Sequence, residues 1–308
     1  MNRKVYCVGE TVYDIIFKNQ KPVEAKPGGA MLNTAVSLGR MGIDVALIGD
    51  LASDKVGDII HDFLKENNVD TTYITRYSDG KSRIALAFLD QENNADYSFY
   101  KIAKSETAKV IIPPINEGDI ILFGSFYGIK EEIRGSIETL ISIGKQKGAL
   151  IIYDPNFRNA HKDILNQVKH YICQNMVWSH IVKGSDEDFF NIFGTENSLD
   201  AFQHIENKKE SIFIYTANKY GVSLHTEKLN NNYSVPNITP LSTIGAGDTF
   251  NAGLIAGLIQ NEIFSTTIFE QSEEHWNKVI QTAIEFATHV CLSYENYLSI
   301  EFAQKLKQ

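Results

Sequence analysis

The stretch Ser242-Thr243-Ile244-Gly245-Ala246-Gly247-Asp248-Thr249-Phe250-Asn251-Ala252-Gly253 joins a glycine-rich turn to the start of an apolar run. Its two glycines flank one alanine and leave the backbone N–H groups unshielded, while residues 249–259 carry small and apolar side chains at helical spacing. Unpaired amides and aligned peptide dipoles at a helix N-terminus attract negative charge. We therefore predict an anion site at this turn, with a phosphate as its occupant.

Asp248 is the unusual member of this stretch, because a carboxylate beside a phosphate site is repelled by the ligand. Its position favours another role, the acceptance of a proton from an attacking hydroxyl group. An alternative stays open, in which the turn is an ordinary loop and Asp248 caps the next helix. A dinucleotide-binding turn is excluded because Phe250 stands at its third glycine, and Gly80-Lys81-Ser82 is no phosphate-binding loop because Thr75 replaces the first glycine.

The composition is that of a globular protein with one large domain or two smaller ones. The chain has 308 residues, of which 43% are hydrophobic, enough for a buried core. A formal net charge of -9 argues against a nucleic-acid surface, which needs clustered Lys and Arg. Cys7, Cys173 and Cys291 are too far apart to predict a disulfide framework or a zinc site. We expect no membrane span, and a reducing, cytoplasmic location.

The order of predicted elements is that of an α/β fold. Strands are predicted at 5–8, 45–48, 120–123, 150–153, 180–182, 212–215 and 222–225. Helices are predicted at 31–41, 56–64, 131–147, 164–176, 249–259, 275–292 and 300–306, with short helices between 186 and 206. Such alternation predicts a mostly parallel sheet flanked by helices, and we treat residues 1–308 as a single domain.

Strand-like segments without helices between them interrupt this alternation. They lie at 71–77, 82–89 and 96–101, and the extended run 11–17 is a further candidate, followed by a polar turn at 21–27. We predict a small β lid from about residues 11–27 and 71–105, with an edge extension of the main sheet as the alternative. Apolar residues on an open lid, such as Phe88, Tyr97 and Phe99, also predict pairing with a second copy of the chain.

Polar segments follow three predicted strands at the point where each strand ends. They are Asp154-Pro155-Asn156-Phe157-Arg158, Lys183-Gly184-Ser185-Asp186-Glu187-Asp188, and Thr216-Ala217-Asn218-Lys219-Tyr220-Gly221. Each segment alone is typical of a turn or a helix cap. Because ligands of doubly wound sheets bind at the carboxyl ends of strands, their shared edge predicts a ligand site.

Two signatures resemble the ribokinase-like (PfkB) family of sugar kinases. The first is Gly28-Gly29-Ala30-Met31-Leu32-Asn33-Thr34-Ala35 through Leu38-Gly39-Arg40-Met41-Gly42, and the second is Thr243-Ile244-Gly245-Ala246-Gly247-Asp248 through Gly253. With Val8-Gly9-Glu10 and the Asp154 segment they occur in the family's order, so the similarity spans nearly the whole chain. The resemblance implies a three-layer fold with a small β-sheet lid, and transfer of the γ-phosphoryl group of ATP, with Mg²⁺, to a sugar hydroxyl.

The resemblance also implies a role for each matching residue. Gly245, Ala246 and Gly247 would form the anion hole for the transferred phosphoryl group, with Asp248 as the base. The sugar would contact Asp14, Gly28, Gly29 and Asn33, together with Tyr100 and Lys101 of the lid. The nucleotide would lie along Asn156, Arg158, Ser185, Thr216 and Gly221, and Asp188 would organise water around Mg²⁺. Other interpretations stay open: a surface salt bridge for Arg158, a packing amide for Asn33 and an exposed strand charge for Lys101.

The chain departs from the family pattern at two places. Ser185 and Asp188 replace the Asn and Glu of the common Lys-Pro-Asn-x-x-Glu segment, although the acidity survives at Asp188. Ser242 stands where many members carry an Asp that contributes to a monovalent-cation site. This second change puts potassium activation in doubt.

The substrate that we expect first is fructose. Relatives acting on 2-keto-3-deoxygluconate tend to carry a Tyr-Arg pair in the lid, where this chain has Phe99-Tyr100-Lys101. That keto-acid, ribose and a nucleoside are the alternatives within the kinase class. A hypothesis of another class is a non-catalytic regulator that binds sugar or nucleotide, against which the intact Asp248 argues.

Overall fold

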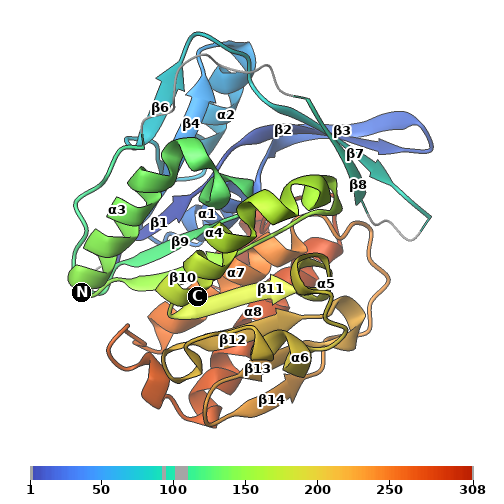
Figure 1. Ribbon diagram of the computed structural model, residues 1–308. Coiled ribbons are helices and arrows are strands. Elements are labelled where there is room, and N and C mark those ends of the chain that lie inside the picture. The colour runs from blue at the N-terminus through green and yellow to red at the C-terminus, as the bar shows by residue number, and fades with distance from the viewer. Residues whose placement is uncertain (1–2, 92–94, 101–109, 307–308) are drawn as a thin grey trace.

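The structure, a computed structural model, describes residues 3–91, 95–100 and 110–306 and has three layers. A central ten-stranded sheet lies between two layers of helices, and a separate four-stranded sheet projects beside it (Figure 1). Alternate residues of each central strand face opposite layers: Val5 and Cys7 pack into one core, Tyr6 and Val8 into the other. The predicted α/β fold with a mostly parallel sheet flanked by helices is confirmed.

The central sheet is parallel except at one edge. Its strands, in spatial order, are β14 (Asn230–Tyr233), β13 (Val222–His225), β12 (Ile212–Thr216), β11 (Ile181–Ser185), β10 (Leu150–Asp154), β9 (Ile120–Gly124), β1 (Val5–Val8), β4 (Val45–Ala52) and β5 (Val69–Asp70). β12, β13 and β14 pair antiparallel. The middle strands are runs of Val, Ile, Leu and Phe because both faces are buried. β14 was not predicted, since Asn230–Tyr233 is a short polar edge strand without an apolar pattern.

Helices cover the two faces of the sheet unequally. One layer holds α1 (Ala30–Arg40), α2 (Lys55–Glu66), α7 (Ala246–Gln260), α8 (Glu273–Cys291) and α9 (Ile300–Lys305), and the other holds α3 (Arg134–Gln146), α4 (Leu165–Trp178), α5 (Asp186–Phe193) and α6 (Ser198–Gln203). The helix α7 is buried without interruption from Asp248 to Leu258, which explains its apolar composition. Within the described ranges no helix combines the length and apolarity needed to cross a bilayer.

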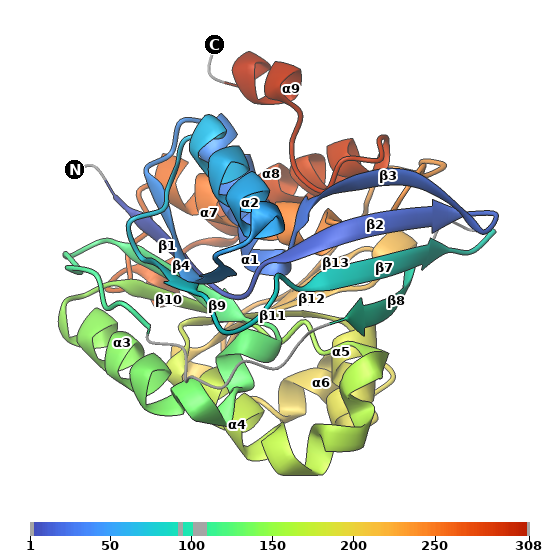
Figure 2. The ribbon, with the colours of Figure 1, turned by 90° about the horizontal axis from the view of Figure 1, so that it is seen from above.

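The small sheet has the order β3 (Lys21–Gly28), β2 (Val12–Lys18), β7 (Ile84–Leu89) and β8 (Ala95–Tyr100). It reaches out past the helices from one end of the central sheet (Figure 2). Two expectations are wrong here. The polar turn expected at 21–27 is the strand β3, which pairs with β2. The segment 71–77 contributes β6 (Ile74–Tyr77), which pairs in parallel with β4 of the central sheet and not with the small sheet.

Candidate active site

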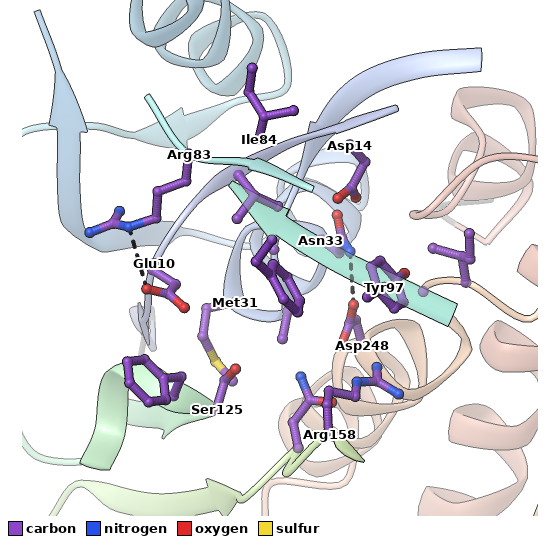
Figure 3. A pocket seen from close by; sticks show the side chains of 18 of the residues that line it. Glu10, Asp14, Met31, Asn33, Arg83, Ile84, Tyr97, Ser125, Arg158 and Asp248 are labelled. Atoms are coloured by element: carbon purple, nitrogen blue, oxygen red, sulfur yellow. Dashed lines mark hydrogen bonds and ion pairs between the residues drawn. The ribbon is translucent and has the colours of Figure 1, made fainter. Parts of the chain in front are cut away.

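A pocket opens between the inner face of the small sheet and the carboxyl ends of the central strands (Figure 3). Of the residues singled out in the sequence, it brings together Asp14, Gly29, Asn33, Tyr100, Asn156, Arg158, Gly245 and Asp248. Residues to which the sequence gave no part in ligand binding complete the lining: Glu10, Val12, Ala30, Met31, Arg83, Ile84, Tyr97, Phe99, Ser125, Phe126, His161 and Ile244. Tyr97 and Phe99 were expected to pair with a second copy of the chain, and they line the pocket instead. Lys101 lies outside the described residues.

Two helices begin at this pocket, each at a glycine that no other residue could replace without strain. Gly29 precedes α1 with φ of 116°, and Gly245 precedes α7 with φ of 78°. A Cβ atom at Gly29 would lie 2.6 Å from the carbonyl oxygen of Glu10, and one at Gly245 would lie 2.2 Å from that of Asn296. The positive ends of two helix dipoles therefore meet at one pocket, as anion binding requires.

Asp248 lies in the first turn of α7 and is buried. The amide Nδ2 of Asn33 donates a hydrogen bond of 2.8 Å to its Oδ2. Burial raises the pKa of Asp248 to about 6, while the Asn33 hydrogen bond and the charge of Arg158 oppose the rise. The capping alternative is wrong, because Gly245 is the N-cap of α7 and no side chain caps this helix. Asp248 is thus a carboxylate that is mostly ionised at neutral pH yet accepts a proton readily.

Asp14 lies across the pocket from Asp248, and Figure 3 shows Asn33 between them. Oδ2 of Asp14 accepts a hydrogen bond of 3.0 Å from Nδ2 of Asn296. Burial, with the charge of Asp248 adding to it, raises the pKa of Asp14 to about 7. Gly28 does not line the pocket; a Cβ there would meet the Asp14 carboxyl group at 1.9 Å, so this glycine leaves room for it. In the described part of the chain, the buried Oδ1 of Asn33 has no hydrogen-bond partner, which suits a hydroxyl donor from a ligand.

A buried cation lies beneath the start of α7. Lys183 forms a 3.0 Å ion pair with Oδ2 of Asp154, and Nδ2 of Asn251 donates to the same oxygen at 2.7 Å. A Cβ at Gly247 would be 3.2 Å from Nζ of Lys183, so the ammonium group approaches the turn closely. Lys183 and Asn251 both belong to segments noted in the sequence, but neither was given a role there. The position of Lys183 directly after the core of a predicted strand was the available signal.

The residues predicted for the nucleotide divide into two groups. Asn156 and Arg158 line the pocket, with the Arg158 guanidinium carbon 5.9 Å from the centre of the Tyr97 ring. Ser185 and Thr216 lie outside the pocket, paired with each other where β11 and β12 end, on the same edge of the sheet. Gly221, with φ of 108°, shapes the turn before β13, and a Cβ there would lie 2.4 Å from the carbonyl oxygen of Tyr233.

Asp188 has a structural role that occupies both of its oxygens. Oδ1 accepts a hydrogen bond of 2.6 Å from the backbone N of Phe157, and Oδ2 accepts bonds of 2.7 Å from both N and Oγ of Ser185. With the bond from the Asp188 backbone N to Oγ of Ser185 these contacts form a capping box at the start of α5. Among the described residues no cluster of three or more metal-ligating side chains occurs. The carboxyl group therefore joins α5 to the segment that carries Asn156 and Arg158.

An ion-pair cluster forms the far end of the pocket, and sequence reasoning missed it. Oε2 of Glu10 lies 2.8 Å from Nζ of Lys130 and 3.6 Å from Nε of Arg83. Nη2 of Arg83 lies 3.2 Å from the buried Oδ2 of Asp50. Counted over the described residues, the two basic and two acidic groups balance in formal charge. These residues come from four separate segments, so their pairing had no signal in the sequence.

Comparisons with known proteins agree with this geometry. The family model described as "pfkB family carbohydrate kinase" matches residues 2–299. A fructokinase of Rhizobium leguminosarum bv. trifolii is 29% identical over 85% of this chain and 81% of its own length, and a fructokinase of Klebsiella pneumoniae is 23% identical over 85% and 87%. The solved structure of a fructokinase double mutant from Vibrio cholerae O395, bound to fructose, ADP and potassium, has a TM-score of 0.85 at 20% identity and covers 100% of this chain and 99% of that one. Aminoimidazole riboside kinase from Salmonella enterica has a TM-score of 0.82 at 19% identity, covering 99% and 100%. This chain belongs to the pfkB family of carbohydrate kinases.

Proposed function

We propose that this protein transfers the γ-phosphoryl group of ATP to a hydroxyl group of fructose. The observation that carries the proposal is the ionised carboxylate of Asp248, held by Asn33 at the start of α7 directly after the turn at Gly245. Family membership supports the sugar kinase reaction, and the fructokinases among the relatives support fructose as the acceptor.

In this reaction a sugar hydroxyl oxygen attacks the γ-phosphorus. The new O–P bond forms while the bond from phosphorus to the β–γ bridging oxygen breaks, and ADP leaves. The hydroxyl proton passes to the carboxylate of Asp248. Because the transition state carries its charge on the phosphoryl oxygens, the amides of Gly245, Ala246 and Gly247 and the dipole of α7 would stabilise it. The Ala246 amide also donates a hydrogen bond of 3.3 Å to the backbone oxygen of Thr243.

The sugar would lie between Asp14 and Asp248, against Asn33 and the bare backbone at Gly29. Two carboxylates and an amide oxygen accept hydrogen bonds from neighbouring hydroxyl groups, and the unpartnered Oδ1 of Asn33 supports this placement. Tyr100, at the end of β8, contributes a partly exposed ring at the pocket rim. The small sheet would act as a lid, inserted in a single kinase domain, that excludes water from the reaction.

The nucleotide would extend from the pocket along the carboxyl ends of β10, β11 and β12. Asn156 and Arg158 lie at the pocket, where a guanidinium group suits phosphate oxygens. Ser185, Thr216 and Gly221 continue along the same edge. Asp188 would organise water around Mg²⁺ and not bind the ion directly, because its oxygens already accept hydrogen bonds from Phe157 and Ser185. Mg²⁺ would arrive on the ATP phosphates and neutralise their charge, and no potassium site is proposed.

The ion-pair cluster at the far end of the pocket favours a neutral sugar. Arg83 supplies the fixed cation that an acid sugar needs, but Glu10 and Asp50 pair with it, and Glu10 also pairs with Lys130. A carboxylate substrate would have to compete with Glu10 for both cations. Fructose is therefore preferred over 2-keto-3-deoxygluconate, and ribose and nucleosides are tested in the same panel.

We further propose a homodimer through the outer face of the small sheet. The cross-strand pairs Ile15–Leu86 and Phe17–Phe88 lie on that face, and Phe88 is 41% exposed. Light scattering should give twice the chain mass, and Phe88→Glu should return it to the monomer mass.

All three cysteines are free thiols, in keeping with the proposed reducing cytoplasm.

The function is tested by coupled ADP release with Mg-ATP and a panel of fructose, ribose, 2-keto-3-deoxygluconate, tagatose and adenosine. Turnover on fructose that disappears in Asp248→Asn supports the proposal. If turnover is found with another member of the panel instead, that compound replaces fructose as the proposed acceptor. No turnover with any acceptor, while ATP and fructose both bind by calorimetry, would support the non-catalytic regulator instead.

A further inference from the structure

Five side chains form a stacked wall along one side of the pocket. Cζ of Arg158 lies 5.9 Å from the ring centre of Tyr97, and the Tyr97 ring stacks on Phe99 with centres 5.7 Å apart. Phe99 stacks on the His161 ring at 5.9 Å, and His161 stacks on Phe126 at 4.8 Å. All five residues line the pocket. We call this set the aromatic wall.

The aromatic wall joins parts of the molecule that no strand pairing connects. Tyr97 and Phe99 stand two residues apart on the same face of β8, the edge strand of the small sheet. Arg158 and His161 follow β10, and Phe126 follows β9. β8 is therefore attached to one segment of the main body at two points, through Arg158 and through His161.

His161 is the member of this wall that joins the small sheet to Phe126 of the main body. Its ring lies between one ring of the small sheet, Phe99 at an interplanar angle of 20°, and one ring of the main body, Phe126 at 25°. Phe157 approaches the same imidazole at 6.2 Å. Phe99 is still 43% exposed, so its ring is held by stacking on Tyr97 and His161 and not by burial in a core.

We propose that His161 is a positioning residue that holds β8 closed over the sugar and links that closure to the nucleotide side of the site. The proposal rests on the proposed function, because it assigns Tyr97 and Phe99 to the cover of the sugar. His161 and the pocket residues Asn156 and Arg158 belong to one short segment after β10. An ordered segment therefore favours the closed small sheet, and a closed small sheet orders the segment.

The first test follows the small sheet without any substrate. In the unliganded protein, amide hydrogen exchange of β8 should accelerate about tenfold in His161→Ala. The loss of a stacked ring pair weakens a contact by about this factor in its equilibrium constant. His161→Phe keeps a flat ring and removes both nitrogen atoms, so it should restore slow exchange. The exposed His170 on α4 supplies the matched control, and His170→Ala should leave β8 unchanged.

The second test is kinetic. His161→Ala should raise the KM for fructose about tenfold and increase ATP hydrolysis in the absence of sugar. His161→Phe should return both values to within about threefold of wild type. Unchanged β8 exchange in His161→Ala would overturn the proposal whatever the substrate is. If His161→Phe behaves like His161→Ala, a nitrogen contact and not stacking is responsible, which also overturns it. Absence of wild-type turnover would count against the kinase function alone, since the exchange test does not depend on it.

Discussion

Nδ2 of Asn33 donates a 2.8 Å hydrogen bond to Oδ2 of Asp248, across a separation of 215 positions in the chain. The two residues lie in the first turns of α1 and α7. A second contact, of 2.9 Å from Oγ1 of Thr34 to the backbone oxygen of Asp248, fixes the two helix starts against each other. Side chains of α1 thus orient the Asp248 carboxylate, while its own helix, α7, contributes the helix dipole.

Replacing Asp248 by Asn should reduce kcat by about 10²- to 10⁴-fold, the usual contribution of a general base. The change keeps the size of the side chain, and an amide oxygen can still accept the Asn33 hydrogen bond. The fold and ATP binding should therefore remain, as measured by thermal melting and calorimetry. A variant that keeps more than a tenth of wild-type kcat would contradict the role of Asp248 as base.

The pH dependence of turnover should have an acid limb set by Asp248. Because burial raises the pKa of this carboxyl group to about 6, its base form is lost as the pH falls through about 6. The Asn33 hydrogen bond lowers that pKa, so Asn33→Ala should move the acid limb of kcat to higher pH. A limb that stays in place in Asn33→Ala would show that another group controls it.

Asp14 should make the protein less stable at alkaline than at acid pH. Its pKa of about 7 in the folded state lies above the ordinary value of 3.8, so the cost of burying its charge is absent below pH 3.8 and complete above pH 7. Asp14→Asn removes that charge and should stabilise the protein by roughly 1–4 kcal/mol at pH 8, and by less at pH 5. Urea unfolding at both values checks this; a variant less stable at pH 8 than wild type would contradict it.

The sequence predicted what depends on local pattern. Gly245, Gly247 and Asp248 are adjacent in the chain, so their anion turn and base could be inferred together. β14, whose Asn-rich strand pairs only at an edge, could not be inferred, because its pairing comes from tertiary context. The prediction of a polar turn at 21–27 was wrong for the same reason, because residues 21–28 form the strand β3 only through their pairing with β2.

Contacts between distant segments were the other feature that could not be predicted. Glu10, Asp50, Arg83 and Lys130 carry charges that are common on any surface, and only the fold brings them together. His161 likewise follows the recognised Asp154–Arg158 segment, but only the fold brings its ring into contact with Phe99 and Phe126. For Asp188, the resemblance indicated a role in organising water around Mg²⁺, and only the structure shows that its oxygens also accept hydrogen bonds from Phe157 and Ser185.

Replacing Glu10 by Gln should shift substrate preference towards acid sugars. The change removes the carboxylate that pairs with Lys130 and Arg83 among the described residues, and the pair of Arg83 with Asp50 remains. A free cation beside the pocket attracts a carboxylate, so kcat/KM for 2-keto-3-deoxygluconate relative to fructose should rise about tenfold. The rise should shrink at high salt. An unchanged ratio would mean that substrate does not reach this end of the pocket.

Gly245 should tolerate no side chain. Its φ of 78° favours glycine, and an added Cβ would lie 2.2 Å from the carbonyl oxygen of Asn296, which is backbone and cannot rotate away. Gly245→Ala should therefore cost about 2 kcal/mol or more in the free energy of unfolding. It should also lower kcat, because any backbone shift displaces the amides aimed at the phosphoryl group.

Gly135 provides the matched control for this substitution. It lies near the start of α3, has no atom within 4 Å of an added Cβ, and lies in a helix where alanine is favoured. Gly135→Ala should stabilise the protein by about 0.5–1 kcal/mol and leave kcat unchanged. Equal stability and activity for the two variants would mean that the turn at Gly245 adapts, and the rigid anion hole at the start of α7 would have to be abandoned.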